Sequence, residues 1–407
     1  MLDFIPIGEM NQLQYPVHSI ARLHKMVQDL APSHSDKPYY FDIPAHFEAL
    51  FLSILPRVIF GPQDLASNPN NFGISNKFFE QTPIKSFHHN AFFELVSATP
   101  DQFRKEMLDK SPLLSDFTVI RNKPFAQTKD RLIPLDMPMC IEKFENAVFW
   151  SIFTPLSDKR KIEFSSFWGR LFEDYVCWLL TNSVNMELNY FCPMPHYADG
   201  QEEEVCDGIV ICGTTAVFIE CKGGLVRGDC KYSNDSTKLG EHLESKYVAP
   251  QGVCQLAKAI DSAFSLSGRR LIRGINLDHV QVVMPLLVTR DNIGGEFFVN
   301  DYLDRKFSDL RGAMHSISQV YCSKLFSISV DTLEKLSPFF IDTRFAKILS
   351  ERYINDPPLR APFFLRENSA LSRKGMNRVP ELLKKITEEV RDLTAKVLEV
   401  DMPKRRK

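Results

Sequence analysis

The spacing of hydrophobic positions changes along this chain, and the change divides it into regions. In the first region the apolar residues recur three or four positions apart, as Ile20, Leu23 and Val27 do, which predicts amphipathic helices. We therefore expect residues 1–155 to form a mainly helical N-terminal domain. Its expected role is either target recognition or binding of a partner protein.

Residues 160–330 show a different pattern, in which helical and strand-like segments follow one another. A strong helix is predicted for "SSFWGRLFEDYVCWLL", and the alternation in "NMELNYF" predicts a half-buried strand. Two more strands are predicted for "EEVCDGIVIC" and "AVFIECK", then a helix for "APQGVCQLAKAIDSAFSL" and strands for "HVQVVMPLLVT" and "KLFSISV". This order of elements favours an α/β fold, with a central sheet flanked by helices.

Residues 331–407 are expected to form a helical C-terminal extension with a basic tail. From Leu383 to Val400 apolar residues recur at alternating spacings of three and four, which indicates a short heptad seam over residues 380–400. Such a seam either packs on its own domain or binds a second copy of the chain or a partner protein. The final "PKRRK" is either a solvated tail or a phosphate contact.

Composition narrows the class of protein without identifying its activity. The chain has 407 residues, of which 44% are hydrophobic and 25% charged, as is typical of a globular protein. A net charge of -2 gives no overall basic field, but a local basic groove beside an acidic site remains compatible with nucleic acid. Nine cysteines without a CxxC pair, an N-terminus unlike a signal peptide and the lack of a long apolar run predict a cytoplasmic protein without a membrane partner.

The segment "DGIVICGTTAVFIECKGG" combines two apolar strands with three charged residues. Because side chains alternate across a strand, Glu220 and Lys222 project from one face and Cys221 from the other. If the two strands pair as a hairpin, Asp207 comes close to Glu220. Two neighbouring carboxylates repel each other unless a proton or a cation lies between them, and such oxygen ligands suit Mg²⁺ or Mn²⁺. The alternative is an ion-pair network on an exposed sheet edge.

The spacing of these residues resembles a known signature. Asp207 followed after twelve residues by Glu220-Cys221-Lys222 is similar to the D…(D/E)xK motif of the PD-(D/E)xK nuclease superfamily, whose restriction-endonuclease-like core runs helix, three strands, helix, strand. The resemblance implies a metal-dependent phosphodiesterase of the endonuclease type. It implies that Asp207, Glu220 and the Cys221 carbonyl hold Mg²⁺ or Mn²⁺, and that Lys222 assists the attacking water.

Two further residues occupy places that are often functional in this superfamily. Glu173 lies on the helix before the three strands, and the resemblance implies that it binds a second ion or orients the first. Gln255 lies on the helix after the ExK strand and would face the metal site or a phosphate. From the residues alone, Glu173 is equally a surface carboxylate paired with Arg170, and Gln255 a solvated residue. Cys206 stands where the signature usually has proline.

Basic residues near the ExK motif are candidates for phosphate contacts. They are Arg227, Lys231, Lys238 and Lys246 in the segment after the motif, and Lys258 on the following helix. Contacts of this kind give affinity for nucleic acid without reading its sequence. The alternative is that each of these residues only keeps its surface soluble. The resemblance favours DNA as the substrate, while the residues themselves are compatible with RNA.

Other catalytic motifs do not occur in the sequence. There is no GxxxxGK[ST] loop, no GxGxxG after a strand, no HExxH and no GxSxG. Cys192, His196 and Cys206 lack a fourth zinc ligand at a suitable spacing, so we interpret these cysteines as buried thiols. Two hypotheses follow. The first is a metal-dependent nuclease, whose architecture would suit host defence; the second is a catalytically silent nuclease-fold subunit that binds nucleic acid or assembles a complex.

Overall fold

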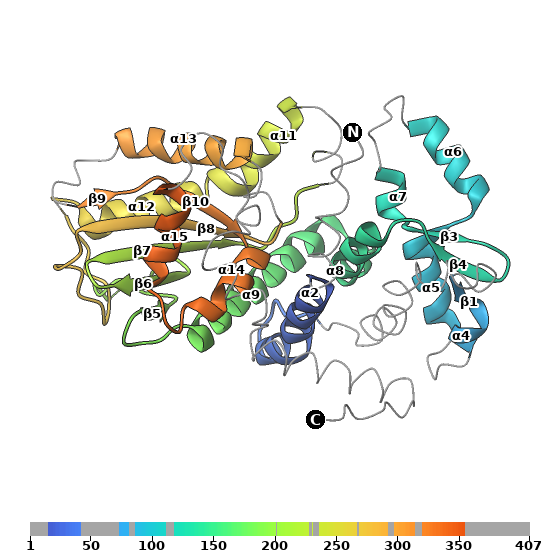
Figure 1. Ribbon diagram of the computed structural model, residues 1–407, viewed down its shortest axis with the longest axis horizontal. Helices are drawn as coiled ribbons and strands as arrows, with labels where there is room; N and C mark the ends of the chain where they lie inside the picture. Colours follow the sequence, from blue (N-terminus) through green and yellow to red (C-terminus); the bar gives the residue numbers. More distant parts are fainter. Residues whose placement is uncertain are drawn as a thin grey trace. The chain divides into compact units, whose positions relative to one another are not determined.

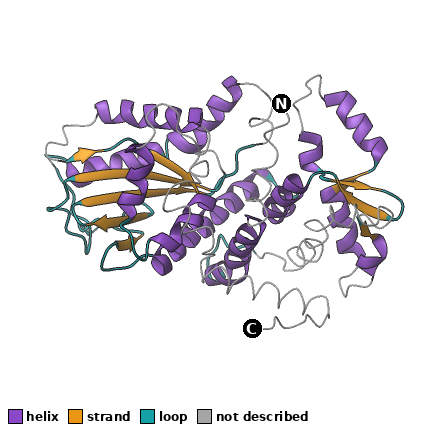
Figure 2. Ribbon diagram, viewed as in Figure 1, coloured by secondary structure: helices purple, strands orange, loops and turns teal. Residues whose placement is uncertain are grey.

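The computed structural model describes residues 15–41, 73–80, 86–110, 118–200, 202–227, 230, 236–266, 268–291, 297–313 and 320–354. These residues form two compact units (Figure 1). The first contains the described residues up to Phe164 together with Cys230, and the second contains the others from Ser165 onward. Both units combine helices with a β-sheet, so the fold is mixed α/β (Figure 2).

The first unit is built from helices and a small sheet. Its elements are α2 (Tyr15–His24), a π-helix (Lys25–Leu30), a 3-10 helix (Ala31–His34), β1 (Ile74–Ser75), α4 (Asn76–Glu80), α5 (Ser86–Val96), β2 (Ser97–Ala98), α6 (Pro100–Lys110), α7 (Thr118–Asn122), β3 (Phe125–Gln127), β4 (Arg131–Pro134), α8 (Met137–Phe153) and the start of α9 (Asp158–Ser183). The predicted helix around Leu23 and Val27 is confirmed, and both side chains are buried.

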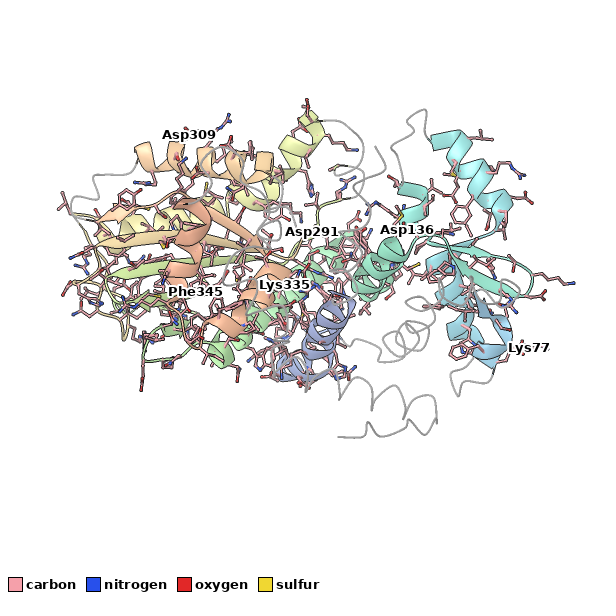
Figure 3. The ribbon with its side chains drawn as sticks, in the orientation of Figure 1. Lys77, Asp136, Asp291, Asp309, Lys335 and Phe345 are labelled. Atoms are coloured by element: carbon pink, nitrogen blue, oxygen red, sulfur yellow. The ribbon has the colours of Figure 1, made fainter. Side chains whose placement is uncertain are left out.

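The sheet of the first unit was not predicted from the sequence. Its strands lie in the order β1-β4-β3-β2. None of them is longer than four residues, so none is long enough to show a clear alternation of polar and apolar side chains. Phe92, Phe125 and Leu132 are fully buried and form the core under it. Asp136, labelled in Figure 3, caps α8 by accepting a hydrogen bond from the Met139 N–H at 2.8 Å.

The second unit contains the elements predicted for residues 160–330, together with α11, α13 and β9, which were not predicted, and the helices after β10. They are most of α9, β5 (Tyr190–Pro193), β6 (Gly208–Cys212), β7 (Thr215–Lys222), α11 (Ser236–Leu243), a π-helix (Glu244–Val248), α12 (Val253–Phe264), β8 (Val282–Thr289), α13 (Phe297–Ala313), β9 (Tyr321–Cys322), β10 (Phe326–Ser329), α14 (Val330–Leu336), a 3-10 helix (Ser337–Phe339) and α15 (Phe345–Ile354). The predicted order of a helix, three strands, a helix and a strand is confirmed, with α11 added between β7 and α12. The first strand begins only at Tyr190, because Met186, Glu187 and Leu188, predicted as part of it, form a turn.

The sheet of the second unit has β7 near its centre. The strand order is β10-β8-β7-β6-β5, with β9 beside β8. Strand β6 pairs antiparallel with both β5 and β7, whereas β8 runs parallel to β7 and β10 runs parallel to β8. Cys212 pairs with Thr215, so the hairpin loop consists of Gly213 and Thr214. Gly213 has a φ of +63°, which a glycine adopts without steric cost.

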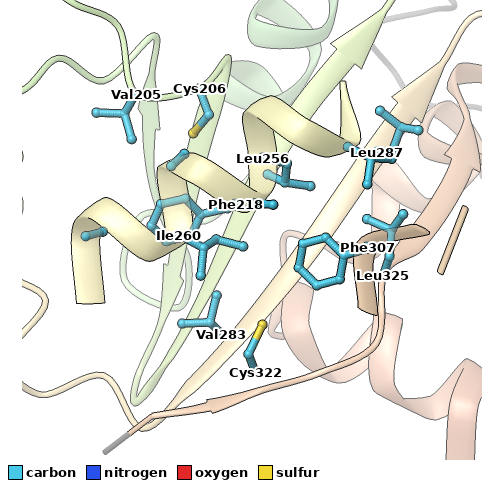
Figure 4. Packing of buried hydrophobic residues seen from close by; sticks show 14 of the residues in the cluster. Val205, Cys206, Phe218, Leu256, Ile260, Val283, Leu287, Phe307, Cys322 and Leu325 are labelled. Carbon is cyan, nitrogen blue, oxygen red and sulfur yellow. The ribbon is translucent and has the colours of Figure 1, made fainter. Parts of the chain in front are cut away.

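Helices cover both faces of this sheet (Figure 1). Helices α12 and α13 pack on one face, where Phe218, Leu256 and Phe307 belong to one buried cluster (Figure 4). Helix α15 contacts β6 and β7 and lies on the other face. Because Phe218 points toward α12, the other even-numbered residues of β7 also point toward that face.

Two sequence predictions concern parts of the chain beyond these ranges. The heptad seam over residues 380–400 and the tail "PKRRK" lie outside the described residues. Within the described ranges, no helix has both the length and the apolar character that a membrane crossing requires.

Candidate active site

The β6–β7 hairpin brings Asp207 and the end of β7 together. Gly208 pairs with Ile219, so one further step in the same register places Asp207 opposite Glu220. The Oδ2 atom of Asp207 accepts a hydrogen bond of 2.5 Å from the Cys221 N–H. The structure therefore contains the proximity that the sequence predicted for a hairpin.

Glu220 and Lys222 lie on the same face of β7 and contact each other. The Nζ of Lys222 donates a hydrogen bond of 2.7 Å to Oε1 of Glu220. The Glu220 side chain is 1% exposed and that of Lys222 is 15% exposed. Asp207 is also buried, so these residues do not form the exposed ion-pair network that was considered as an alternative.

The second carboxylate oxygen of Glu220 is left without a partner. Its Oε2 atom is buried and accepts no hydrogen bond from the described residues. A buried polar atom in this state costs roughly 1–3 kcal/mol, and more when the group is charged. The ion pair with Lys222 therefore satisfies only one oxygen of Glu220. The other oxygen, Oε2, can bind a proton or a cation.

Burial and mutual repulsion perturb the titration of this cluster. Burial, followed by the charge of Asp207, raises the pKa of Glu220 to about 8, while Lys222 acts in the opposite direction. Burial also raises the pKa of Asp207, against the effects of Lys222 and the Cys221 hydrogen bond. Burial lowers the pKa of Lys222, but the charges of Glu220 and Asp207 outweigh it and the net shift is upward. Two carboxyl groups and one ammonium group thus share one electrostatic environment.

Glu173 of α9 belongs to the same environment. Burial raises the pKa of Glu173 to about 7, and the charge of Asp207 adds to the shift. Lys222 lowers this pKa, and the charge of Arg170 lowers it less. Since Asp207 and Lys222 both influence Glu173 more than Arg170 does, the structure associates Glu173 with the cluster and not mainly with Arg170.

A glycine after β7 explains how α9 comes close to the site. A Cβ atom on Gly223 would lie 2.7 Å from the Cβ of Phe172, which is closer than side-chain carbons approach each other. Only the absence of a side chain at position 223 allows α9 this position. Phe172 directly precedes Glu173, so this close packing places Glu173 beside the end of β7.

The start of α12 lies against Lys222. Gly252, which directly precedes α12, has a φ of +78°, and a Cβ atom there would lie 3.4 Å from the Cε of Lys222. Gln255 follows in the first turn of α12 and is half-buried. Within the described ranges no hydrogen bond joins Gln255 to the cluster, so the structure brings its helix, but not its amide group, into contact with the site.

Glu204 is a further carboxylate near Asp207 that was not predicted from the sequence. Partial burial of its carboxyl group raises the pKa of Glu204, and the charge of Asp207 adds to this shift, while His196 opposes it. Glu204 is the last of three consecutive glutamates, which read as a solvated charge run. Its sequence position three residues before Asp207 was the only available signal, and neither helix nor strand periodicity connects the two.

The predicted phosphate contacts differ in where they lie. Arg227, Lys246 and Lys258 are exposed, Lys238 is half-buried, and Lys231 lies outside the described residues. The Nζ of Lys246 is 3.7 Å from the position that a Cβ atom would take on Gly224, two residues after Lys222. Lys246 is thereby placed against the segment that directly follows β7.

The described residues include no group of three or more His, Cys, Asp or Glu side chains arranged to hold a metal ion. This also applies to Cys192, His196 and Cys206. Cys206 is a buried thiol as predicted, whereas Cys192 is only half-buried. Mg²⁺, however, is often held by one or two carboxylates together with water and substrate phosphate. Asp207 and the unpartnered Oε2 of Glu220 fit that smaller requirement.

Comparisons with known proteins give no assignment. No protein-family model matches the chain, and neither a curated protein nor a solved structure matches it. A functional conclusion therefore depends on the geometry and chemistry of the site.

Proposed function

We propose that this protein is a metal-dependent nuclease of the PD-(D/E)xK, restriction-endonuclease-like type, which hydrolyses phosphodiester bonds. The observation that carries the proposal is the buried Oε2 of Glu220, which has no hydrogen-bond partner in the described part of the chain. It lies opposite Asp207 and on the same face as Lys222. Burying two carboxyl groups that repel each other, one of them with an oxygen that has no hydrogen-bond partner, does not stabilise the fold. The arrangement is therefore better explained by a function than by stability.

Asp207, Glu220 and the backbone carbonyl of Cys221 would hold Mg²⁺ or Mn²⁺, with Glu173 as a further carboxylate. When bound, the divalent ion supplies positive charge that stabilises the phosphoryl group and lowers the pKa of the attacking water. Asp207 is oriented by the Cys221 N–H, so one of its oxygens is held in place before substrate arrives. The burial of Glu220 fixes its carboxyl group in the same way.

Lys222 and Glu173 would act on charge and protons. The ammonium of Lys222 lies at the partly exposed end of the cluster, where it can stabilise negative charge that develops on phosphoryl oxygens. Burial and the charge of Asp207 raise the pKa of Glu173 to about 7 in the metal-free cluster, so this carboxyl group would give up its proton when the ion binds near neutral pH. Gln255, in the adjacent turn of α12, would orient substrate or the ion.

Nucleic acid is the proposed substrate, with DNA favoured over RNA. Lys246, Arg227 and Lys258 are exposed in the unit that contains the cluster, and Lys246 lies against Gly224, two residues after Lys222. With a net charge of -2, binding would depend on this local group of cations and not on the charge of the whole chain. A homodimer or a partner protein, bound through residues 380–400 or the N-terminal region, remains part of the proposal.

A cleavage assay tests this function directly. Plasmid, single-stranded DNA and RNA are incubated with Mg²⁺, Mn²⁺ or EDTA, and the wild-type protein is compared with Asp207→Asn and Lys222→Met. We expect cleavage only with a divalent ion, and a loss of at least roughly a hundredfold in each variant.

Two matched substitutions control for general damage. Glu187→Gln changes an exposed carboxylate, and Lys306→Met changes a lysine of α13 that is paired with Glu244 at 3.0 Å. Both are expected to cleave like the wild type. Equal cleavage by all five proteins would refute the assignment of the site. Binding of nucleic acid without cleavage by the wild type would instead support the alternative, a catalytically silent nuclease-fold subunit.

A further inference from the structure

A cavity of about 580 Å³ lies at the other end of the same sheet. It is formed by the β6–β7 loop, the first residues of β8, the segment around β9 and β10, and the start of α15. Its lining residues are Cys212, Thr214, Thr215, Val282, Met284, Tyr321, Ser323, Lys324, Phe326, Arg344, Ala346, Lys347 and Ser350. The lining contains three cationic side chains and five hydroxyl groups, and no carboxylate. A volume of this size suits a small organic ligand.

The cavity is separate from the cluster of Asp207, Glu220 and Lys222. Thr215 begins β7 and lines the cavity, whereas Lys222 ends the same strand. Eight residues of extended chain place these ends roughly 23 Å apart. Thr215 also has the opposite parity to Glu220 and Lys222, so its side chain points to the α15 face and theirs to the α12 face.

The rim of the cavity is positively charged. Arg344 is exposed, and its Nη1 lies 3.3 Å from the position that a Cβ atom would take on Gly213 of the hairpin loop. Within the described ranges Arg344 forms no ion pair with a carboxylate. Lys324 forms a long ion pair of 3.9 Å with Asp304, so its charge is partly compensated. Because Arg344 directly precedes α15, the positive end of that helix faces the same region; Phe345, its first residue, is labelled in Figure 3.

The walls of the cavity are apolar and include an accessible aromatic ring. Val282, Met284 and Phe326 come from the α15 face of neighbouring strands β8 and β10. Tyr321 of β9 also lines the cavity and is 69% exposed. A large aromatic side chain left this open can stack on a flat ring, and base–aromatic stacking contributes about 1–3 kcal/mol. The cavity thus presents a stacking surface beside a group of cations.

We propose that this cavity binds a phosphorylated nucleoside, with its phosphate at Arg344 and Lys347 and its base on Tyr321. The ligand is a free nucleotide or the phosphorylated end of a nucleic-acid strand, since both offer this chemistry. Arginine matches the geometry of a phosphate through its planar fork of donors, and the serine and threonine hydroxyls of the cavity supply further hydrogen bonds.

Equilibrium binding to the full-length protein tests the proposal. The probes are AMP, UMP, adenosine, inorganic phosphate, and a short single strand with either a 5′-phosphate or a 5′-hydroxyl. Binding of AMP or UMP, with adenosine bound at least tenfold more weakly, is the expected result if free nucleotides are the ligand. Binding of the 5′-phosphorylated strand, with the 5′-hydroxyl strand and free nucleotides much weaker, assigns the ligand to a strand end.

Variants locate the binding. Arg344→Glu should weaken nucleotide binding at least tenfold, and Tyr321→Ala should weaken it about fivefold to a hundredfold while leaving the affinity for inorganic phosphate unchanged. Arg305→Glu alters a 77%-exposed arginine of α13 outside the cavity and should bind like the wild type. Asp207→Asn should also retain binding, because the proposal is independent of the nuclease site.

Three results would overturn the proposal. One is the absence of binding by every phosphorylated probe at millimolar concentration. Another is an affinity that Arg344→Glu and Tyr321→Ala leave unchanged in proteins whose thermal unfolding matches the wild type. The third is loss of binding in Asp207→Asn, which would place the ligand in the nuclease site.

Discussion

Glu220 is a carboxyl group buried away from water, and among the described residues it has one hydrogen-bond donor, the ammonium of Lys222. Ionisation of Glu220 is therefore unfavourable, and its pKa is raised to about 8. Burial is the larger cause of this shift, and the charge of Asp207 is the next. At neutral pH the cluster therefore holds a proton that a divalent cation would displace. Competition of this kind makes metal affinity increase with pH.

Stability should depend on pH through Glu220. Its pKa is raised from 4.5 to about 8 on folding, so between these values the folded protein binds more protons than the unfolded chain. The free energy of unfolding therefore falls as pH rises through this window. Glu220→Gln removes the ionisation, and we expect it to be more stable than the wild type by about 1–3 kcal/mol above pH 8 and to lose this advantage near pH 4.5.

Urea denaturation at a series of pH values measures this difference. Glu187→Gln, at an exposed carboxylate, serves as the control and should follow the wild-type curve. If the free energies of unfolding of the wild type and of Glu220→Gln differ by the same amount at every pH from 4.5 to 9, Glu220 does not titrate as described.

The position of Lys246 leads to a prediction about salt. Its ammonium lies beside the backbone of Gly224, two residues after Lys222, and the side chain is exposed. If it contacts a phosphate, Lys246→Ala should weaken DNA binding and reduce the slope of log affinity against log salt by about one. Binding is measured with Asp207→Asn as the parent protein, so that no cleavage occurs. Lys306→Ala is the control, and an equal slope for both substitutions would contradict a phosphate contact by Lys246.

At the level of elements, the site is defined by how closely three of them approach one another. Helix α9 approaches the end of β7 because Gly223 has no side chain, and α12 begins against Lys222 because Gly252 adopts a positive φ. The sequence predicted each of these elements from its periodicity. The sequence did not indicate how closely these elements approach one another, because a glycine in a sequence does not show which distant residue packs against it.

Gly223→Ala tests the importance of this close approach. The added methyl group would lie 2.7 Å from the Cβ of Phe172 and would displace α9 together with Glu173. We expect a loss of about 1–3 kcal/mol in stability and a lower cleavage rate. Gly169→Ala lies on the same helix with no atom within 4 Å of the new methyl group, and it should stabilise the protein by about 0.5–1 kcal/mol. Equal effects of the two substitutions on urea denaturation would be inconsistent with tight packing at position 223.

At the level of the molecule, the described residues form two units with separate buried cores. Phe92 belongs to the core of the first unit and Leu256 to that of the second, and both are 0% exposed. Helix α9 contributes residues to both units, so their unfolding is not expected to be fully independent.

Calorimetry of core variants tests this organisation. Removing a buried Phe or Leu side chain costs about 2–5 kcal/mol, so Phe92→Ala should lower the transition of the first unit and Leu256→Ala that of the second. Leu256→Ala should reduce cleavage activity more than Phe92→Ala does, because the cluster lies in the second unit. A single transition that both substitutions lower equally would indicate that the units unfold as one.

Local periodicity was sufficient to predict the succession of α9, three strands, α12 and β8, and the shared face of Glu220 and Lys222, but it did not predict α11. These features follow from the geometry of neighbouring residues, which the sequence contains directly. Periodicity could not predict the strands of two to four residues in the first unit, because so few residues are too short to show an alternation of polar and apolar side chains.

Burial, pKa and the cavity depended instead on segments that are distant in sequence. Strand β7 is buried because β8 and α12 pack around it. The packing of α9 on Gly223 brings Glu173 under the influence of the charge of Asp207. Arg344 lies beside Gly213 of the hairpin loop, although more than a hundred residues separate them in the sequence. The cost of a charge in a protein is set by everything that surrounds it, and those surroundings come into existence only when the chain folds.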